Sequence, residues 1–219
     1  MLVKEIMTPN PQTVSQATLV MDALKVMRAN HFRRLPVMDK DNKIIDIVTD
    51  RDLSAVKASP ATTLSAYELN YLLAKLTIND VITSLKKDKR PLITVDMHDP
   101  VDKAAVLLRD NKIGGLPVLD GDVLVGMITE SDIFSALVEI LGLQDEGVLL
   151  TIELSEDSIG VMAKISKKIA DYQGNIRSIV KYTSRTGKEK VELKIETDKI
   201  EEIKKALQDE GFNIINEYQ

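Results

Sequence analysis

The sequence predicts an α+β protein in which a β-α-β-β-α unit occurs twice and a β-α-β-β-α-β segment follows. The main observation is an internal repeat, because the stretch from Ile44 to Asp52 returns between Val123 and Asp132. Both copies end in an apolar pair, a Thr, two polar residues and an Asp, and both follow a Leu-Pro-Val run. After residue 147 the spacing of apolar residues changes. Since a repeat defines the units of a fold, the chain divides into two related parts and a third, different one.

Composition limits the classes of protein to which this chain can belong. It has 219 residues, of which 44% are hydrophobic and 29% charged, as is ordinary for a globular protein. A formal net charge of -5 argues against general nucleic-acid binding, which needs a basic surface. The absence of Cys excludes disulfides and thiolate metal sites. We find neither a signal-peptide core nor an apolar run of about 20 residues, so we expect a cytoplasmic protein that does not enter a membrane.

In the first copy, apolar residues recur at the spacing of an amphipathic helix. Leu19, Ala23 and Met27 mark this helix, which we expect between Ser15, a favourable N-cap, and Asn30. Short β-favouring runs bounded by turn residues are typical of strands. The expected order is a strand at 12–14, the helix, a strand at 35–38, a turn at 39–42, a strand at 44–48 and a helix from Asp52.

The second copy repeats this order after an intervening segment. Residues 59–77 should form an inter-repeat helix, because Ser65 to Glu68 has the form of a capping box and leucines follow at helical spacing. We interpret the basic loop from Lys86 to Arg90 as a solvated surface, with an anion-binding patch as the alternative. The remaining expected elements are a strand at 92–95, a helix from Pro100, strands at 116–119 and 123–128, and a helix at 133–141.

Two such copies, each with Leu-Pro-Val-x-Asp and an apolar pair before Thr-x-x-Asp, resemble a tandem pair of CBS domains, a Bateman module. The repeats would span residues 1–58 and 78–141, with the helix 59–77 between them. The resemblance implies that the repeats pack about a pseudo-twofold axis. It also implies that the clefts between them bind an adenosine compound as a regulatory ligand: AMP, ADP, ATP or S-adenosylmethionine.

The residue types at the repeated motif suit such a ligand. A carboxylate such as Asp52 or Asp132 can accept both ribose hydroxyls. The preceding Thr lies at a helix N-terminus, where backbone N–H groups favour an anion. Arginine side chains can neutralise a phosphate or a methionine carboxylate. The nucleotide-binding residues implied by the resemblance are Ile6, Thr8, Arg34, Leu35, Pro36, Thr49, Arg51, Asp52, Thr83, Gly115, Leu116, Pro117, Thr129, Ser131 and Asp132.

The Thr-x-x-Asp motif also has a simpler interpretation, since Thr and Asp are common at plain helix starts. Arg33 and Arg34 can be interpreted equally well as surface charges or as ligand contacts. The two copies differ, because Asp46 stands where the family usually has Gly, which is Gly126 in the second copy. Asp50–Arg51 give the first copy the better phosphate chemistry, whereas Glu130–Ser131 disfavour a polyphosphate in the second.

The remainder of the chain has a different order of elements. Residues 142–146 should form a linker, and residues 147–219 a domain of the ferredoxin-like type. Apolar residues at 161, 165 and 169 mark one helix, and those at 200, 203 and 207 mark another. The expected strands lie at 148–154, 176–182, 191–195 and 212–217.

Asp157-x-x-Gly160 before the first of these helices, and Gly174-Asn175-Ile176 after it, resemble an ACT domain. This resemblance implies edge-to-edge pairing and an amino-acid site formed by Asp157, Ile159, Gly160, Asn175 and Ile176. Ile159 stands where the family usually has Pro, and the alternative is a dimerisation module without a ligand. The order CBS-CBS-ACT resembles the bacterial acetoin utilisation AcuB family.

These features predict a regulatory sensor that is not an enzyme. The chain has only His31 and His98, which we interpret as solvent-facing or capping residues, and no phosphate-binding Gly-rich loop. We therefore expect no catalytic residue, no metal site and no catalytic cofactor. The expected partners are an adenosine-containing small molecule, an amino acid, a second copy of the chain in a homodimer and a metabolic enzyme. The alternative is a structural dimerisation protein whose clefts are vestigial.

Overall fold

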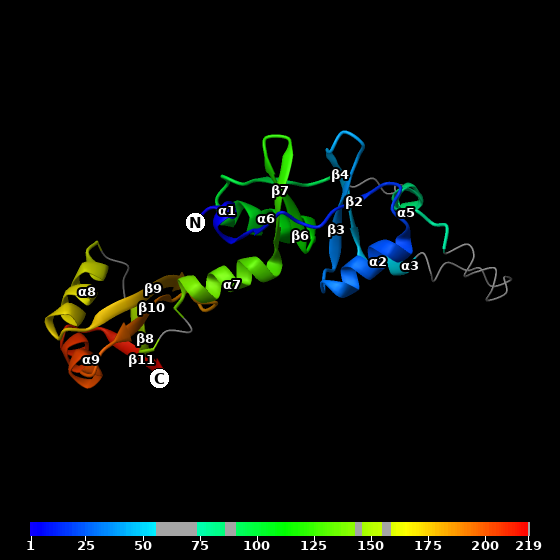
Figure 1. Cartoon of the computed structure of the whole chain (residues 1–219). Coiled ribbons are helices and arrows are strands. Elements are labelled where there is room, and N and C mark those ends of the chain that lie inside the picture. Colours follow the sequence, from blue (N-terminus) through cyan, green and yellow to red (C-terminus); the bar gives the residue numbers. More distant parts are fainter. Residues whose placement is uncertain (56–73, 86–90, 143–145, 155–158, 219) are drawn as a thin grey trace. The chain divides into compact units, whose positions relative to one another are not determined.

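The computed structural model describes residues 1–55, 74–85, 91–142, 146–154 and 159–218 (Figure 1). These residues form two compact units, Met1–Ile133 and Phe134–Gln219. Most of the inter-repeat helix expected at 59–77 lies outside the described residues, and so does the basic loop from Lys86 to Arg90.

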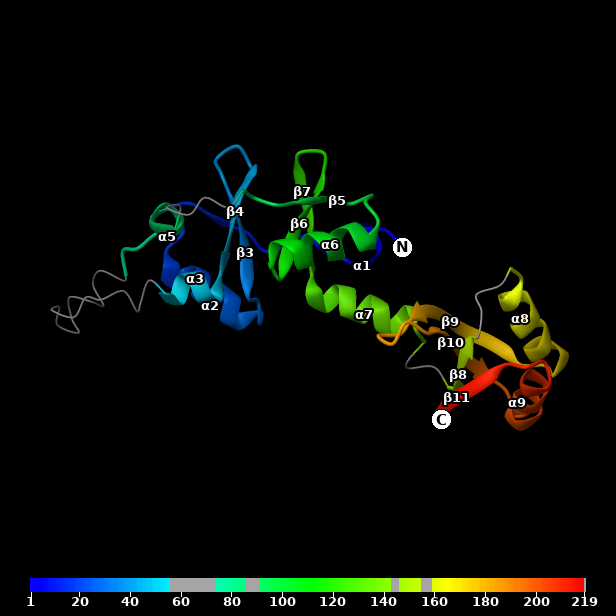
Figure 2. The same cartoon turned by 180° about the vertical axis from the view of Figure 1, so that it is seen from behind.

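The first repeat has the predicted order β-α-β-β-α. Strand β2 pairs in parallel with β3, and β3 pairs antiparallel with β4, which gives a sheet in the order β2-β3-β4. The helix begins at Val20 and not directly after Ser15, because Thr18 Oγ1 accepts a hydrogen bond from the N–H of Ser15 and holds a turn there. Helices α2 and α3 lie side by side in both views of the chain (Figures 1 and 2). The elements are β2 (Val14–Ser15), α2 (Val20–Ala29), β3 (Arg34–Met38), β4 (Ile44–Thr49) and α3 (Asp50–Ala55).

The second repeat follows the same order, and its sheet contains one additional strand. Its sheet has the order β1-β7-β6-β5, in which β1 (Thr8–Pro9) comes from the start of the chain. The register places Thr8 opposite Met127, and a Cβ on Gly126 would lie 2.5 Å from the Sδ of Met7. Gly126 therefore lets the N-terminal segment approach β7. The other elements are β5 (Val95–Asp96), α6 (Val101–Asn111), β6 (Gly115–Asp120), β7 (Val123–Thr129) and α7 (Glu130–Ile140).

Each repeat is completed by the short helix that precedes the other repeat. Helix α1 (Val3–Ile6) places Val3 in the core of the second repeat with Leu116 and Ile128. Helix α5 (Ile78–Leu85) places Ile78, Val81 and Ile82 in the core of the first repeat. Backbone hydrogen bonds fix both exchanges, from Val3 to Asp99 O (2.9 Å) and from Ile78 to Thr18 O (2.8 Å). The exchange was not predicted from the sequence.

The C-terminal unit has the predicted order β-α-β-β-α-β. Its antiparallel sheet has the order β11-β8-β10-β9, and Ile165 and Ile169 of α8 pack with Ile203 and Leu207 of α9 in its core. This arrangement is compatible with an ACT domain but does not by itself establish that family. The elements are β8 (Val148–Leu154), α8 (Val161–Asp171), β9 (Asn175–Thr183), β10 (Glu189–Glu196), α9 (Ile200–Asp209) and β11 (Asn213–Tyr218).

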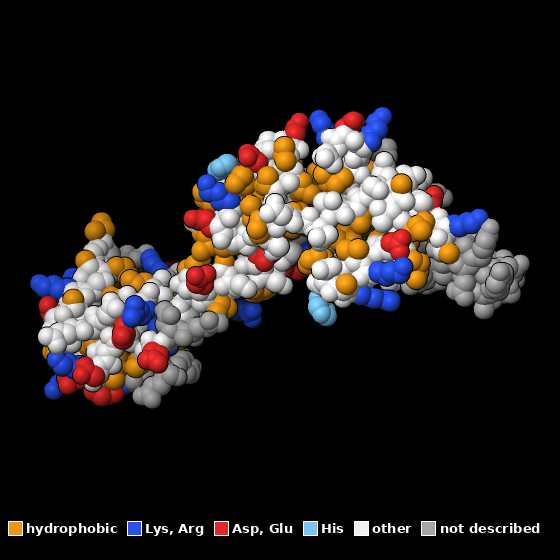
Figure 3. Space-filling view, in the orientation of Figure 1, with side chains coloured by type: hydrophobic (Ala, Val, Ile, Leu, Met, Phe, Trp, Pro, Cys, Tyr) orange, Lys and Arg blue, Asp and Glu red, His pale blue; other side chains and the backbone are white. Residues whose placement is uncertain are grey.

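The described surface is mixed in charge. Acidic and basic side chains are interspersed on the face shown in Figure 3. Within the described ranges, no helix combines the length and the apolar character needed to cross a membrane.

Gly147, at the entrance to β8, is a position where we expect a large cost of substitution. Its φ is +133°, and a Cβ would lie 2.7 Å from the carbonyl oxygen of Ile195. Gly147→Ala should therefore lower the free energy of unfolding of the C-terminal unit by about 2–4 kcal/mol, through strain and overlap together. Urea unfolding followed by circular dichroism measures this loss.

Gly187→Ala is the matched control, because Gly187 also has a positive φ (+80°) but nothing within 4 Å of a Cβ. Its cost should be about 1–2 kcal/mol from backbone strain alone. Equal losses in the two variants would show that the contact with Ile195 is unimportant.

Candidate functional site

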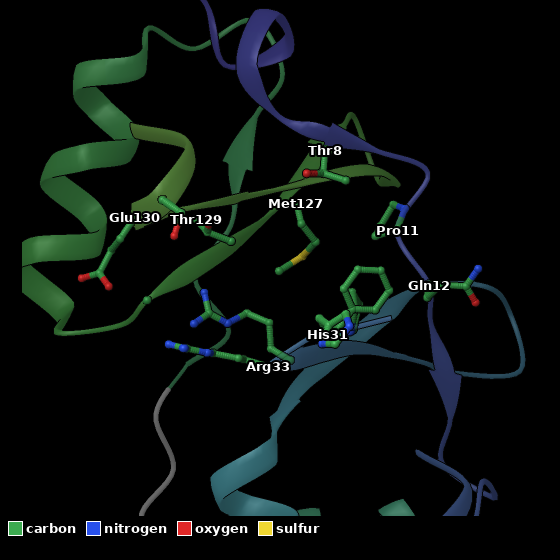
Figure 4. A pocket seen from close by; sticks show the side chains of 13 residues that line it. Thr8, Pro11, Gln12, His31, Arg33, Met127, Thr129 and Glu130 are labelled. Carbon is green, nitrogen blue, oxygen red and sulfur yellow. The ribbon is translucent and has the colours of Figure 1, made fainter. Parts of the chain in front are cut away.

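The first unit contains a pocket of about 410 Å³ between segments of its two repeats. Residues of the first repeat form one wall and residues of the second form the other, and the N-terminal segment, whose strand β1 pairs with β7, contributes Thr8, Pro11 and Gln12. In Figure 4, His31 and Arg33 approach from the side of the first repeat, and Met127, Thr129 and Glu130 from the second. The lining residues are Thr8, Pro11, Gln12, His31, Phe32, Arg33, Arg34, Pro36, Gly114, Met127, Thr129, Glu130 and Ser131.

The turn at the end of α2 places residues of the first repeat in the wall of the pocket. Asn30 caps the helix, and its Nδ2 donates to Val26 O at 2.9 Å. His31 then adopts a left-handed conformation with φ +57°, which turns the chain so that the N–H of Phe32 reaches Met27 O. The residues that follow enter β3, where Arg34 and Pro36 continue the wall. The helix terminus therefore explains why His31 is at the pocket.

The junction of β7 and α7 forms the facing wall. Met127 and Thr129 come from β7, and Glu130 and Ser131 from the first turn of α7. The N–H and the Oγ1 of Thr129 both donate to Oδ2 of Asp132 at 2.7 Å. The same carboxylate accepts both hydrogen bonds and so caps the start of α7.

The same Thr-x-x-Asp hydrogen bonds occur at other helix starts. Thr49 donates to Asp52 through its N–H (2.8 Å) and its Oγ1 (2.7 Å). Thr77 does the same to Asp80, with equal distances, at the start of α5. These bonds lower the pKa of the exposed Asp80 carboxyl below its usual value. The motif therefore forms a helix cap at each of these three positions, and Thr129 also lines the pocket.

Arg34 is the most unusual charged residue of the site. Burial lowers the pKa of its guanidinium below the usual value, while the nearby carboxylates of Glu130, Asp50 and Asp132 oppose this effect and Arg33 adds to it. Its Nη1 is buried and has no hydrogen-bond partner among the described residues. The guanidinium lies against Gly114 and Gly115 of the other repeat.

The structure brings together some of the predicted nucleotide-binding residues in the pocket: Thr8, Arg34, Pro36, Thr129 and Ser131. Leu35 and Leu116 lie in the cores of the two repeats, and Ile6 packs against the core of the second. Gly115 and Pro117 are buried on β6, and Asp132 lies one residue beyond the lining. Thr83 is exposed on α5. Thr49, Arg51 and Asp52 lie at the junction of β4 and α3, which is the counterpart in the first repeat of the junction of β7 and α7.

Several lining residues were not predicted from the sequence. Pro11 and Gln12 follow β1, and Phe32 lies between α2 and β3. Met127 resembles an ordinary strand residue. Their position in the repeat could have indicated them, because each lies within a few positions in the sequence of a predicted nucleotide-binding residue.

The predicted amino-acid site of the C-terminal unit is only partly described. Asp157 lies outside the described residues. Ile159 and Gly160 are exposed before α8, and Gly160 has φ +85°. Asn175, at the start of β9, donates to Glu196 at 3.4 Å, and Ile176 packs against the core of the unit.

Comparison with known proteins identifies the family. The family model of the CBS domain matches residues 3–59 and 77–139, which is more than half of the chain. The chain belongs to the CBS domain family. A CBS domain-containing protein of Dictyostelium discoideum is 37% identical over 141 residues, which is 64% of this chain and 93% of the relative. The match covers the two repeats and leaves the family of the C-terminal unit open.

Solved structures of other CBS proteins agree with the fold of the first unit. A Vibrio cholerae protein described as an acetoin utilization protein (AcuB) has a TM-score of 0.52 and 29% identity, over 67% of this chain and 97% of that one. The CBS domain pair of protein MJ0100, in complex with 5′-methylthioadenosine and S-adenosyl-L-methionine, has a TM-score of 0.50 and 27% identity. This likeness covers 63% of our chain and 95% of that pair.

Other relatives are much longer, and this chain spans only 20–24% of several of them. The activities of those proteins therefore do not transfer to it. In the part of the chain that the structure describes, no group of three or more His, Cys, Asp or Glu side chains is arranged to hold a metal ion.

Proposed function

We propose that this protein is a regulatory sensor that binds an adenosine-containing ligand, AMP, ADP, ATP or S-adenosylmethionine, in the pocket of its first unit. CBS domain pairs are typically regulatory and not catalytic. The observation on which the proposal rests is the pocket itself, which places cations of one repeat opposite the Thr-x-x-Asp motif of the other. The complex of the MJ0100 pair with two adenosine compounds supports the ligand class.

The pocket suits the parts of such a ligand. Its volume of about 410 Å³ lies within the usual range of small-molecule sites, about 300–1,000 Å³. Phe32, Pro36 and Met127 offer apolar surface for a purine ring. Asp132 would accept the ribose hydroxyls, which requires one of its oxygens to face the ligand while Oδ2 keeps the bonds from Thr129.

Helix α7 offers a route by which occupancy affects the rest of the chain. Its first residues, Glu130 and Ser131, line the pocket, and its last, Ile140, belongs to the C-terminal unit. If the ligand binds one conformation of the start of α7 more tightly than another, its binding shifts the equilibrium toward the conformation that it prefers. The proposed receiver of the signal is the C-terminal unit or a metabolic enzyme partner.

For the C-terminal unit we propose a dimerisation role. Strand β9 is at the edge of its sheet, and Ile179 on this strand is 45% exposed. An unpaired edge strand is a ready surface for pairing with a second copy. An ACT domain that binds an amino acid near Gly160 is the alternative to this proposal.

Thermal unfolding of the intact protein tests the sensor. A ligand at about 100 times its dissociation constant should stabilise the folded first unit by about 2.7 kcal/mol. The panel contains AMP, ADP, ATP, S-adenosylmethionine and several amino acids, with GMP as the control for base identity. A shift with adenosine compounds and not with GMP would support the proposal. No shift with any adenosine compound at millimolar concentration would reject it and leave the structural role.

A further inference from the structure

We infer that the two repeats bind one adenosine ligand per chain, at the junction of β7 and α7, because β7 has Gly126 where β4 has Asp46. This inference rests on the proposed function and specifies which of the two related clefts is used. It depends on three features of the structure: the approach of the N-terminal segment to β7, the side chain of Asp46, and the conformation of the chain at the end of α5.

The N-terminal segment forms part of the pocket because it lies directly against β7. Strand β1 places Thr8 opposite Met127, and both residues line the pocket. Pro11 and Gln12 follow on the same segment and line it as well. A Cβ on Gly126 would lie only 3.1 Å from the carbonyl oxygen of Thr8. A glycine at this position of β7 therefore lets the segment come close enough to close one side of the pocket.

The first repeat has a side chain at the equivalent position of β4. Asp46 precedes the Thr of its motif by three residues, as Gly126 does in the second repeat. Oδ1 of Asp46 accepts a hydrogen bond from the N–H of Ile47 at 2.8 Å. Ile47 is the counterpart of Met127, where β1 joins the other sheet. A segment that approached β4 as β1 approaches β7 would therefore meet the side chain of Asp46.

The chain also differs in conformation after the buried start of each short helix. Val3 and Ile78 are equivalent core residues, so Thr83 corresponds to Thr8. Thr8 precedes a proline, which disfavours the helical conformation, and it lies on β1 after α1 has ended. Thr83 precedes a serine and is still part of α5. The counterpart of Thr8 is therefore held in a helix and not on a strand beside β4.

Among the residues that the structure describes, the cleft beside Thr49 thus has no counterpart of the wall that Thr8 gives to the pocket beside Thr129. Small-molecule sites usually enclose about 70–90% of the surface of their ligand, so a missing wall lowers the affinity strongly. Arg51 gives the cleft beside Thr49 the more favourable charge for a phosphate, but charge does not replace this enclosure. We therefore expect the adenosine compound to bind beside Thr129 only.

The number of ligand molecules bound per chain tests the inference on the intact protein. AMP, ADP, ATP and S-adenosylmethionine are each titrated by isothermal calorimetry, and every compound that binds should saturate at about one molecule per chain. Gly126→Asp places the side chain of the first repeat in the second, and it should weaken binding about 10-fold or more. Gly126→Ala should weaken binding less, because its side chain is smaller. Thermal unfolding without ligand shows for both variants that the first unit is folded.

Asp46→Ala is the matched control, because Asp46 holds the same position in the other repeat and is not part of the pocket lining. This variant should leave unchanged both the affinity and the number of molecules bound per chain.

The outcomes separate the inference from the proposed function. If about two molecules of one compound bind per chain, or if folded Gly126→Asp and Gly126→Ala bind as tightly as the unaltered protein, the inference is wrong while the sensor stands. A loss of affinity in Asp46→Ala as large as that in Gly126→Asp would also overturn it. If no adenosine compound binds the unaltered protein, the proposed function fails and the inference fails with it.

Discussion

Replacing Asp132 with alanine is expected to weaken the binding of the adenosine ligand about 100-fold. The carboxylate is proposed to accept hydrogen bonds from the ribose, and a hydrogen bond to a charged group contributes about 1.5–3 kcal/mol. The variant also loses the cap of α7, because the N–H and Oγ1 of Thr129 both donate to this carboxylate. Isothermal titration with the ligand found in the thermal screen measures the change in affinity.

Asp80→Ala separates the loss of the ligand contact from the loss of the cap. Asp80 makes the same two hydrogen bonds, with Thr77, but is not part of the pocket. Its loss should cost about 1 kcal/mol of stability, as other N-cap substitutions do, with the affinity unchanged. Asp52→Ala shows in addition whether the cleft at Thr49 takes part. Equal affinities for Asp132→Ala and Asp80→Ala would contradict the proposed role of Asp132.

Replacing Ile165 with alanine is expected to lower the free energy of unfolding of the C-terminal unit by about 2–5 kcal/mol. Ile165 is fully buried on α8, in a core that contains residues of the C-terminal unit only. Calorimetry of the intact chain should show one transition moving to lower temperature. The transition that shifts with adenosine ligands, which belongs to the first unit, should stay in place.

Lys167→Ala is the control on the same helix, because Lys167 is exposed and its loss should change stability by less than about 0.5 kcal/mol. Loss of ligand binding in Ile165→Ala would contradict the division into two separately stabilised units.

The order of elements was predictable because it depends on local periodicity. Leu19, Ala23 and Met27 define one face of a helix at a fixed spacing, and all but Leu19 are buried. Strand β1 was not predictable, since it has only two residues and its partner β7 lies far along the chain. Pairing over such a separation leaves no local pattern in the sequence.

The site was predictable to the extent that it coincides with the repeat. Thr129 and Pro36 belong to repeated motifs, and both line the pocket. The motif Thr-x-x-Asp alone is a weak guide, because Thr77–Asp80 makes the same hydrogen bonds at a helix start outside the pocket. His31 was interpreted as solvent-facing, and it is exposed while also lining the pocket, because the left-handed turn after α2 places it there. Such a turn is not evident from residue type alone, because only a few per cent of non-Gly residues adopt it, even though His is among those that do so more often.

The exchange of α1 and α5 between the repeats affects the chain while it is being synthesised. When the first repeat has left the ribosome, its core still lacks Ile78, Val81 and Ile82. Val3 in turn stays without its partners Leu116 and Ile128 until the second repeat has been made. Domains usually fold in order during translation, the N-terminal one first. In this protein the two repeats instead complete each other, so we expect neither core to be closed before the strand β7 has been synthesised.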